Sequence, residues 1–359
     1  MPFSRELVKE AFVYPEDIYP VYQEMEQKLR LNLCNPLDDI GLKIQANLRE
    51  MVDAGLKWNV LGMDLSAILK NKSSSITREH IDLLHELYFK FNEHDLIHWG
   101  VDFTHRLGKD PSSDKGDGID NLDRDGFLKV EDFGVDDAVL NSLTDTSEDV
   151  FKATETVYNS AHKAWVSVTS NGTVSTARLS LPQLEPFILN KKYQGILTSY
   201  LGDRVKLDGY KLTRLNPAAT SDMETSYVAS RWHHDRTGRR IKLFIFLHDV
   251  DCEQGHPTKV AAGTHNLVYY RTETLPSSRF TDKFVQENYQ IVEGCGKRGG
   301  GFIFDTHTIH RGTPEGSDPR TTLIMEYHNS NKCLLVRELG LGLPCPSGDQ
   351  FIIDREITA

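Results

Sequence analysis

Two histidines and an aspartate have the residue types and the spacing with which proteins hold a divalent metal ion. His233 and Asp235 stand two positions apart, and His310 follows 75 positions after Asp235. Residues i and i+2 of an extended strand point to the same face, so His233 and Asp235 are expected to share one ion while His234 faces away. His310, from a remote strand, would complete a set of two histidines and one carboxylate. On an octahedral Fe(II) that set leaves three positions open, as oxygen activation requires.

Arg320 follows His310 by ten positions and adds the chemistry of carboxylate binding. A guanidinium presents paired N–H donors that match the two oxygens of a carboxylate. Beside a metal site, its expected task is to clamp a co-substrate such as 2-oxoglutarate. The leading interpretation is an enzyme with Fe(II) as cofactor and 2-oxoglutarate and O2 as co-substrates. His233, Asp235 and His310 would be its catalytic and metal-binding residues.

Residues from about 181 to 330 resemble the phytanoyl-CoA dioxygenase-like family of Fe(II)/2-oxoglutarate-dependent oxygenases. Besides the four residues above, Gly263-Thr264-His265 matches the family's Gly-Ser-His element. Residues 300–305 loosely match its Gly-Asp approach to the distal histidine, and residues 200–205 resemble its entry to the first core strand. Gly301 departs from the family, which usually has Asp at that position.

The resemblance implies a double-stranded β-helix, a cupin-like jelly roll, that oxidises a small organic molecule. The bound iron and co-substrate supply the oxidising chemistry, while the protein supplies orientation and excludes water. Hydroxylation, desaturation, ring closure and endoperoxide formation use the same iron site in this family, so the outcome stays open. We expect specialised metabolism and a carboxylate-bearing, amino-acid-derived substrate, as in kainoid-forming enzymes. That substrate would suit the basic residues Arg231, Arg236, Arg239, Arg240 and Lys242. The alternatives are a hydroxylase of an acyl-CoA and a non-catalytic cupin-like metal-binding protein.

Other histidines compete with these assignments. His307 is a second candidate for the third ligand, but it precedes the expected strand end, so His310 is favoured. His234 is interpreted as a supporting or surface residue. His248, His256 and His265 are expected to be hydrogen-bonded loop residues rather than ligands.

The pattern of apolar residues changes along the chain. Helical spacing predicts helices over residues 15–33, 36–56, 77–99, 147–168 and 181–201. Short β-branched and aromatic runs predict strands over residues 205–210, 241–247, 290–292, 302–304 and 321–327. We therefore expect an α+β protein, with residues 1–180 as a mainly helical N-terminal region packed on the core. Residues 181–359 would form the jelly-roll dioxygenase domain.

Residues 110–132 are rich in Asp, Gly and Ser and are expected to form a loop. Within them, Asn121 to Asp132 has oxygen donors at positions 1, 3, 5 and 12 of an EF-hand loop and Gly at position 6. Position 12 is Asp rather than Glu, and Pro111-Ser112-Ser113 upstream is no helix. A solvated acidic loop or a lid is therefore preferred. A calcium-regulated interaction protein is the rival interpretation.

Composition narrows the function classes. The chain has 359 residues and a formal net charge of -11, which argues against nucleic acid or an anionic membrane as a partner. It shows no apolar run long enough to cross a bilayer, and the first residues lack the apolar core of a signal peptide. Five scattered cysteines without CxxC spacing predict reduced thiols and a cytoplasmic location. The expected partner is a small-molecule substrate, and the oligomeric state stays open.

Overall fold

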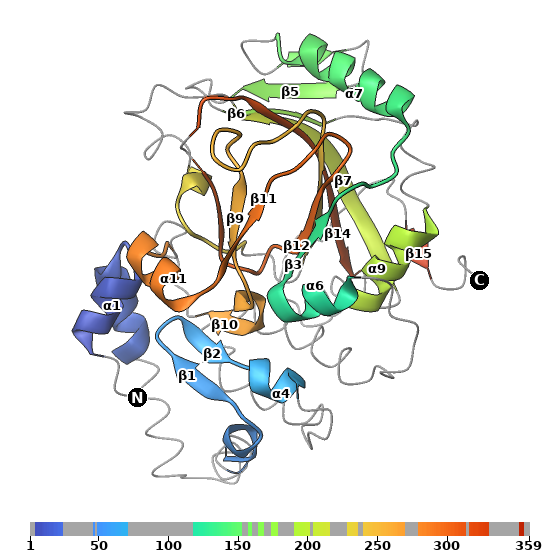
Figure 1. Ribbon diagram of the computed structural model, residues 1–359. Coiled ribbons are helices and arrows are strands. Elements are labelled where there is room, and N and C mark those ends of the chain that lie inside the picture. Colours follow the sequence, from blue (N-terminus) through green and yellow to red (C-terminus); the bar gives the residue numbers. More distant parts are fainter. Residues whose placement is uncertain are drawn as a thin grey trace.

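Two antiparallel sheets lie at the centre of the protein (Figure 1). The computed structural model describes residues 4–23, 46, 49–70, 118–152, 157–159, 164–168, 174–178, 190–201, 204–215, 228–235, 240–269, 279–313, 316–329 and 352–354. The large sheet has the order β3-β12-β8-β14-β7-β6-β5-β4, and β15 also pairs with β7. Its strands are β3 (Phe127–Val130), β4 (Val157–Asn159), β5 (Ala164–Val168), β6 (Val174–Arg178), β7 (Arg204–Leu215), β8 (Ile241–Phe246), β12 (Gly301–Asp305), β14 (Arg320–Asn329) and β15 (Ile352–Asp354).

The small sheet has the order β11-β9-β13, formed by Ile291–Gly294, Thr258–Ala261 and His310–Gly312. A third sheet joins β1 (Lys57–Asn59), β2 (Gly62–Asp64) and β10 (Leu267–Tyr269). From β8 onward the chain passes between the first two sheets: β8 is in the large sheet, β9 and β11 in the small one, β12 in the large, β13 in the small and β14 in the large. This winding is that of a double-stranded β-helix, so the predicted α+β fold with a jelly-roll core is confirmed.

The helices are α1 (Arg5–Ala11), α4 (Ser66–Lys70), α6 (Ile119–Asp125), α7 (Asp137–Val150), α9 (Lys191–Leu201) and α11 (Asp282–Asn288), with short 3-10 turns η2 (Val228–Ser230) and η3 (Thr264–Asn266). Residues 15–23 and 49–53 are also helical. None of the helices in the described ranges is long and apolar enough to cross a membrane.

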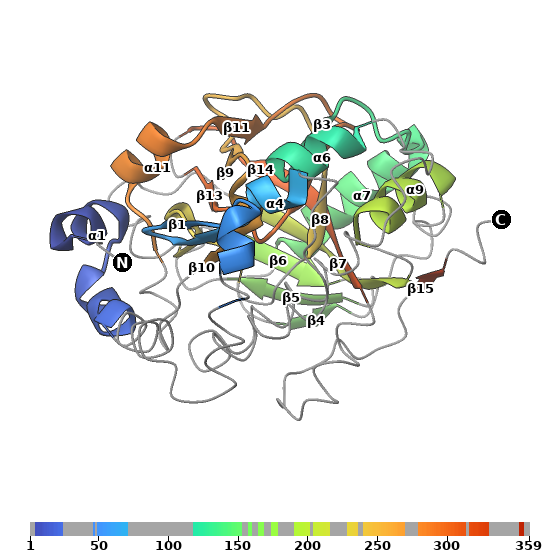
Figure 2. The same cartoon turned by 90° about the horizontal axis from the view of Figure 1, so that it is seen from below.

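Strand β8 is apolar on both faces except at Lys242, and both faces are covered. Ile241, Leu243 and Ile245 pack with residues of α6, α7 and α9 on the outer face of the large sheet. Phe244 and Phe246 point the other way and pack with residues of both sheets, including Val260 of β9. The period-two alternation thus separates a helix-covered layer from the interior between the sheets. Figure 2 shows α6 and α9 beside the large sheet.

Gly301, where the resembled family usually has Asp, lies where β12 approaches β8 too closely for a side chain. Its φ is +156°, and a Cβ there would be 1.8 Å from the carbonyl oxygen of Phe244. The departure from the family therefore has a local steric reason and touches none of the proposed ligands.

The loop predicted over residues 110–132 is wrong for its second half. The described part forms α6 and then β3, which pairs with β12. Asp and Asn are weak helix formers, but Ile119 and Leu122 are buried among residues of α9, and burial outweighs propensity. Gly126, at φ +70°, ends the helix in the left-handed region.

This correction removes the structural basis of the calcium alternative. The first five positions of the presumed EF-hand loop lie on α6, and its seventh residue begins β3. The segment is therefore neither the continuous loop that encloses calcium nor a lid. Within the described residues, it contributes to neither of the two clusters of potential metal ligands.

The helix predicted over residues 147–168 is also wrong beyond its first turn. Helix α7 ends at Val150, and β4 and β5 follow as antiparallel strands of the large sheet. Val157 lies opposite Val166, and Tyr158 lies opposite Trp165. Such β-branched and aromatic cross-strand pairs stabilise a sheet, so pairing with β6 decides the local structure.

The predicted strands are confirmed by β7, β8, β11, β12 and β14, although β7 and β14 are longer than predicted. The predicted helix 181–201 is confirmed from Lys191, and its first residues lie outside the described ranges. The described parts of the predicted helices 15–33 and 36–56 are helical at 15–23 and 49–53, and residues 77–99 lie outside. The domain division at residue 180 stays a prediction. Strands from both sides of this position share the large sheet.

The prediction of reduced thiols is wrong for one pair. Cys252 and Cys295 form a disulfide between the segment after β8 and the segment after β11, 43 positions apart. The adjoining residues Val250 and Gly296 exchange main-chain hydrogen bonds of 2.8 and 2.9 Å. These two segments meet only in the folded protein, so the bond has no CxxC spacing by which it could be predicted from the sequence. The cytoplasmic location stays a prediction, without this support from cysteine chemistry. Cys34, Cys333 and Cys345 lie outside the described residues.

The disulfide gives a first testable expectation. Replacing Cys252 and Cys295 together by Ser should lower the free energy of unfolding by about 2–4 kcal/mol, because the bond restricts a long loop of the unfolded chain. Urea unfolding of both proteins without reductant measures the difference. Peptide mapping before reduction should recover the two cysteines as one linked peptide. Quantitative alkylation of both thiols at that stage would contradict the bond.

Candidate metal centre

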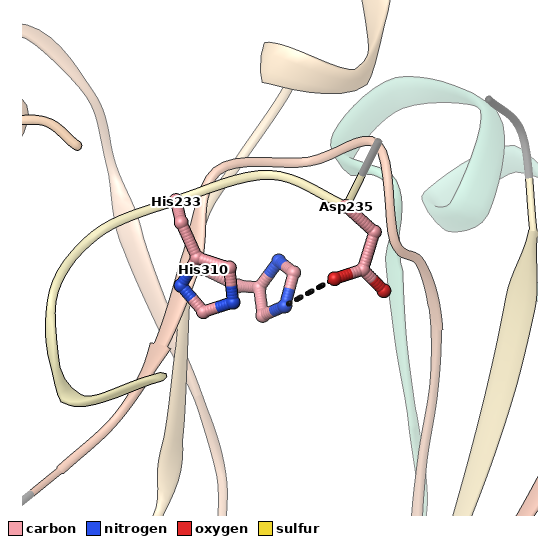
Figure 3. Close-up of side chains that lie close together, drawn as sticks. All are labelled: His233, Asp235 and His310. Carbon is pink, nitrogen blue, oxygen red and sulfur yellow. Dashed lines mark ion pairs between the residues drawn. The ribbon is translucent and has the colours of Figure 1, made fainter. Parts of the chain in front are cut away.

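His233, Asp235 and His310, called the triad below, come together at a bridge between two segments (Figure 3). His233 N–H donates to the His310 carbonyl at 3.0 Å, and His310 N–H donates back at 2.7 Å. The N–H of Asp235 donates to the carbonyl of Thr306 at 3.0 Å. These main-chain hydrogen bonds thus fix the backbone positions from which all three side chains extend. Their potential ligand atoms lie within 4.8 Å of one another.

Main-chain carbonyls also orient both imidazoles of the triad. Nδ1 of His233 lies 2.8 Å from the Arg231 carbonyl, and Nδ1 of His310 lies 2.8 Å from the Thr308 carbonyl. A carbonyl only accepts, so each Nδ1 carries the hydrogen and donates it. Each Nε2 is then left with a lone pair. This pattern of carbonyl-bonded imidazoles is the usual one for metal-binding histidines.

Burial favours the neutral imidazoles that metal binding requires. It lowers the pKa of His233 well below the usual value, and His310 and Arg279 act in the same direction. Burial also lowers the pKa of His310, against the opposing effect of Asp235. Burial, the largest single effect, would raise the pKa of Asp235, but Lys242, His310 and His233 together outweigh it and keep the carboxylate ionised. Two neutral nitrogens and one carboxylate form a donor set that fits Fe(II) and related first-row ions.

The Gly263-Thr264-His265 element supports the segment that leads to His310. The Thr264 hydroxyl donates to the Ala261 carbonyl at 2.7 Å and accepts from the N–H of Ile309 at 2.8 Å. Asp305, fully buried at the end of β12, accepts from the Tyr200 hydroxyl at 2.7 Å and from the N–H of His307 at 2.8 Å. The turn before His310 is therefore held by Thr264 of η3 on one side and, through Asp305, by Tyr200 of α9 on the other.

His307, the competing ligand, is placed apart from the triad. Its Nε2 lies 2.9 Å from the Leu267 carbonyl, and its ring packs edge-on against Tyr269. His234 is buried, not at the surface, and stacks on Tyr269 with ring centroids 3.9 Å apart. The expectation of hydrogen-bonded loop histidines is confirmed for three others. His248, His256 and His265 each lie within hydrogen-bond distance of main-chain groups.

Four charged side chains form a network beside the triad, called the charged network below: Lys211, Arg240, Lys242 and Glu326. Glu326 is 2.8 Å from Lys211 Nζ, 3.1 Å from an Arg240 nitrogen and 3.9 Å from Lys242 Nζ. Lys242 Nζ also contacts Oδ2 of Asp235 at 2.7 Å. Lys242 and Glu326 lie opposite each other on β8 and β14, on the inner face with Phe244. The interior therefore carries an excess of positive charge next to the metal centre.

Arg320 lies at the start of β14 and is buried. Its guanidinium donates to the Thr258 hydroxyl of β9 at 3.0 Å. On the same strand, Val260 lies opposite His310, while Thr258 lies opposite Gly312. Thr258 and Val260 are two residues apart on β9, and two residues of a strand span about 7 Å. The contact of Arg320 with Thr258 therefore lies about 7 Å along β9 from the position opposite His310.

The other basic residues that the sequence offered as substrate contacts lie in different places. Arg231 donates to the Tyr14 hydroxyl at 2.8 Å at an exposed position, and Arg236 and Arg239 lie outside the described residues. On β7, Lys211 faces the interior, whereas Arg214 contacts Glu148 of α7 and Thr321 on the outer face. The sequence did not show which face of β7 points to the interior, and these contacts place Lys211 on the inner face and Arg214 on the outer face.

Sequence reasoning missed three residues near the site, Glu326, Thr258 and Arg279, and also the contact of Lys242 with Asp235. For Lys242 and Glu326 the sequence did hold a signal. Lys242 and Glu326 interrupt apolar runs of β8 and β14 at positions that share the inward face with phenylalanine and isoleucine. A charge at a buried strand position needs a partner, so such pairs point to one another. Thr258 and Arg279 carry no such signal.

No family model matches the chain, and no curated protein matches it. Solved structures share part of its outline. The non-heme, alpha-ketoglutarate-dependent epimerase SnoN from nogalamycin biosynthesis is 16% identical, with a TM-score of 0.46 over 66% of this chain and 97% of that one. The carbocyclase SnoK from the same biosynthesis is 14% identical, with a TM-score of 0.42 over 59% and 83%. HygX from Streptomyces hygroscopicus, solved with nickel, 2-oxoglutarate and hygromycin B, is 12% identical, with a TM-score of 0.40 over 59% and 86%. Every one of these TM-scores is below 0.5, so the chemistry of this chain rests on its own residues.

The charged network predicts a pH-dependent stability. Burial acts to raise the pKa of Glu326, but Lys242, Lys211 and Arg240 outweigh it and lower that pKa. A lowered folded-state pKa stabilises the protein above the ordinary glutamate value of about 4.3, and this stabilisation is lost as the pH falls through the folded-state value. Glu326→Gln should therefore reduce the free energy of unfolding by about 1–3 kcal/mol at pH 7, and by less as the pH falls below about 4.3.

Urea unfolding at pH 7.0, 5.0 and 4.0 measures this dependence. Glu293→Gln is the matched control, because the ion pair that Glu293 forms with Lys259, at 3.0 Å, lies at a more exposed position. Its effect should stay below about 1 kcal/mol. Equal effects of the two variants at pH 7 would contradict the expectation.

Proposed function

We propose that the protein is an Fe(II)- and 2-oxoglutarate-dependent oxygenase that oxidises a small organic molecule. The observation that carries the proposal is the joint placement of the triad and Arg320. The triad supplies the donor set, and the buried guanidinium of Arg320 lies two residues further along β9 from the level of His310. A non-catalytic metal site has no need of such a guanidinium.

The dimensions support 2-oxoglutarate as the co-substrate. The separation of about 7 Å along β9 is comparable to the length of a five-carbon chain with a carboxylate at its far end. The Thr258 hydroxyl beside Arg320 offers a further polar contact to that carboxylate. Arg320 and Thr258 would then fix one end of the molecule, and the metal would hold the other.

The protein's own residues would hold the metal ion, orient its ligands and exclude water from the site. His233 and His310 present neutral Nε2 atoms, and Asp235 presents an ionised carboxylate. Phe304 packs edge-on against the His310 ring, with centroids 5.0 Å apart, and helps exclude water from the metal side. When bound, the iron and 2-oxoglutarate supply the oxidising chemistry that amino-acid side chains lack.

The charged network supports a substrate that carries a carboxylate. Three cations surround one glutamate on the inner face, and Lys211 and Arg240 remain partly exposed. This excess of positive charge favours an anionic substrate, such as an amino-acid derivative of specialised metabolism. The proposed reaction is hydroxylation or oxidative cyclisation, with desaturation as a further outcome of the same site. Membership of the phytanoyl-CoA dioxygenase-like family is part of the same proposal.

The triad is tested by anaerobic titration with Fe(II) and then 2-oxoglutarate, followed by visible absorption. The wild type should develop the charge-transfer band of the chelate, and His310→Ala should lose it because an essential ligand is gone. His307→Ala, which removes a nearby histidine outside the triad, should keep the band. Iron binding without a band would favour a non-catalytic cupin-like protein. Absence of iron binding in the wild type would overturn the metal assignment.

Arg320 is tested in the same titration. Arg320→Ala should weaken 2-oxoglutarate binding about 10- to 100-fold, the effect of losing a charged hydrogen-bonded partner, while Fe(II) affinity changes less than about threefold. Arg214→Ala, which removes an arginine from the outer face of the same sheet, should change neither. Equal loss of iron and 2-oxoglutarate binding in Arg320→Ala would contradict the assigned role.

A further inference from the structure

The two oxygens of the Asp235 carboxylate face different partners. Oδ2 contacts Lys242 Nζ at 2.7 Å, whereas Oδ1 faces Nε2 of His310 at 3.9 Å. Only Oδ1 therefore points toward the side of the carboxylate where the histidine nitrogens gather. Figure 3 shows this oxygen directed at the His310 ring.

Lys242 is held in this position from its other side. It leaves β8 on the inner face, directly opposite Glu326 of β14, and its side chain is 17% exposed. Glu326 lies 3.9 Å from the Lys242 ammonium and is fixed in turn by Lys211 of β7 and Arg240. Three neighbouring strands thus hold the ammonium beside Asp235.

We propose that Lys242 is a positioning residue that restricts Asp235 to one metal-binding oxygen. The inference rests on the proposed function, since it assigns Lys242 a role toward the iron of that site. A carboxylate with both oxygens free can chelate an ion and occupy two of its positions. With Oδ2 held by an ammonium, Asp235 offers Oδ1 alone.

The number of open positions gives this restriction its consequence. Two imidazoles and one carboxylate oxygen leave three positions on an octahedral ion, two for 2-oxoglutarate and one for O2. A chelating Asp235 would leave two, and 2-oxoglutarate would take both. Lys242 therefore keeps the position that O2 requires. It does so at the expense of metal affinity, because an ammonium repels a nearby divalent cation.

Nitric oxide, which binds the O2 position of ferrous sites, is the probe. Fe(II) alone, 2-oxoglutarate and nitric oxide are added in turn, without O2, to the wild type, Lys242→Met and Lys242→Arg. Iron affinity, the charge-transfer band and the EPR signal of the iron–nitrosyl complex are measured separately. Lys242→Met should bind Fe(II) as tightly as the wild type or up to about tenfold more tightly, and it should keep the band. Its nitric oxide affinity should fall at least about tenfold, and Lys242→Arg, which keeps the charge, should restore it.

Lys259→Met is the matched control, because Lys259 forms its ion pair with Glu293 on β9 and β11, away from the triad. It should behave as the wild type. If Lys242→Met does not fold, Lys242→Gln replaces it, with an expected loss of about threefold in nitric oxide affinity. Unchanged nitric oxide affinity, or loss of iron binding in a folded variant, would overturn the inference. A wild type that binds no iron would overturn the proposed function instead.

Discussion

The main-chain bridge between His233 and His310 is the constraint on which the site depends. Two reciprocal hydrogen bonds join the segment before β8 to β13 of the small sheet. A third, from Asp235 to Thr306, ties the same segment to the turn after β12. The triad is thus positioned by backbone that the two sheets hold in place, and its side chains need little further ordering. Rigid strands and bridges of this kind hold a metal site more accurately than free loops do.

Charge inside the barrel is the second constraint. The inner face carries phenylalanines on β3, β8 and β12, and burying an ion beside them is unfavourable unless it is paired. The charged network satisfies this condition with three cations, Glu326 and the Asp235 carboxylate. Proteins place such local conflicts with apolar packing mainly at functional sites. The network also connects the Asp235 carboxylate to the partly exposed Lys211 and Arg240.

Local patterns predicted the jelly-roll core well, because alternation and β-branched runs identify strands that are buried on one or both faces. The triad and Arg320 were selected as candidates from residue type and spacing alone. The failures have a common physical cause. Residues 119–125 and 157–168 take their structure from partners far away in the chain, and Cys252 meets Cys295 only after folding. The partners of Lys242 lay beyond sequence reasoning for the same reason, since cross-strand register is not a local property.

The pairing of β3 with β12 has a consequence for how the chain must fold. Val130 lies opposite Gly301, so the large sheet joins segments about 170 positions apart. During synthesis β3 has to wait for most of the core to emerge before it finds its partner, and such long-range contacts form slowly. Until then, β12 presents one unpaired edge next to the turn that carries His310, and open edges of this kind favour association between chains. Strand β3 thus precedes most of the core in the chain but completes its edge of the large sheet only after β12 has been made.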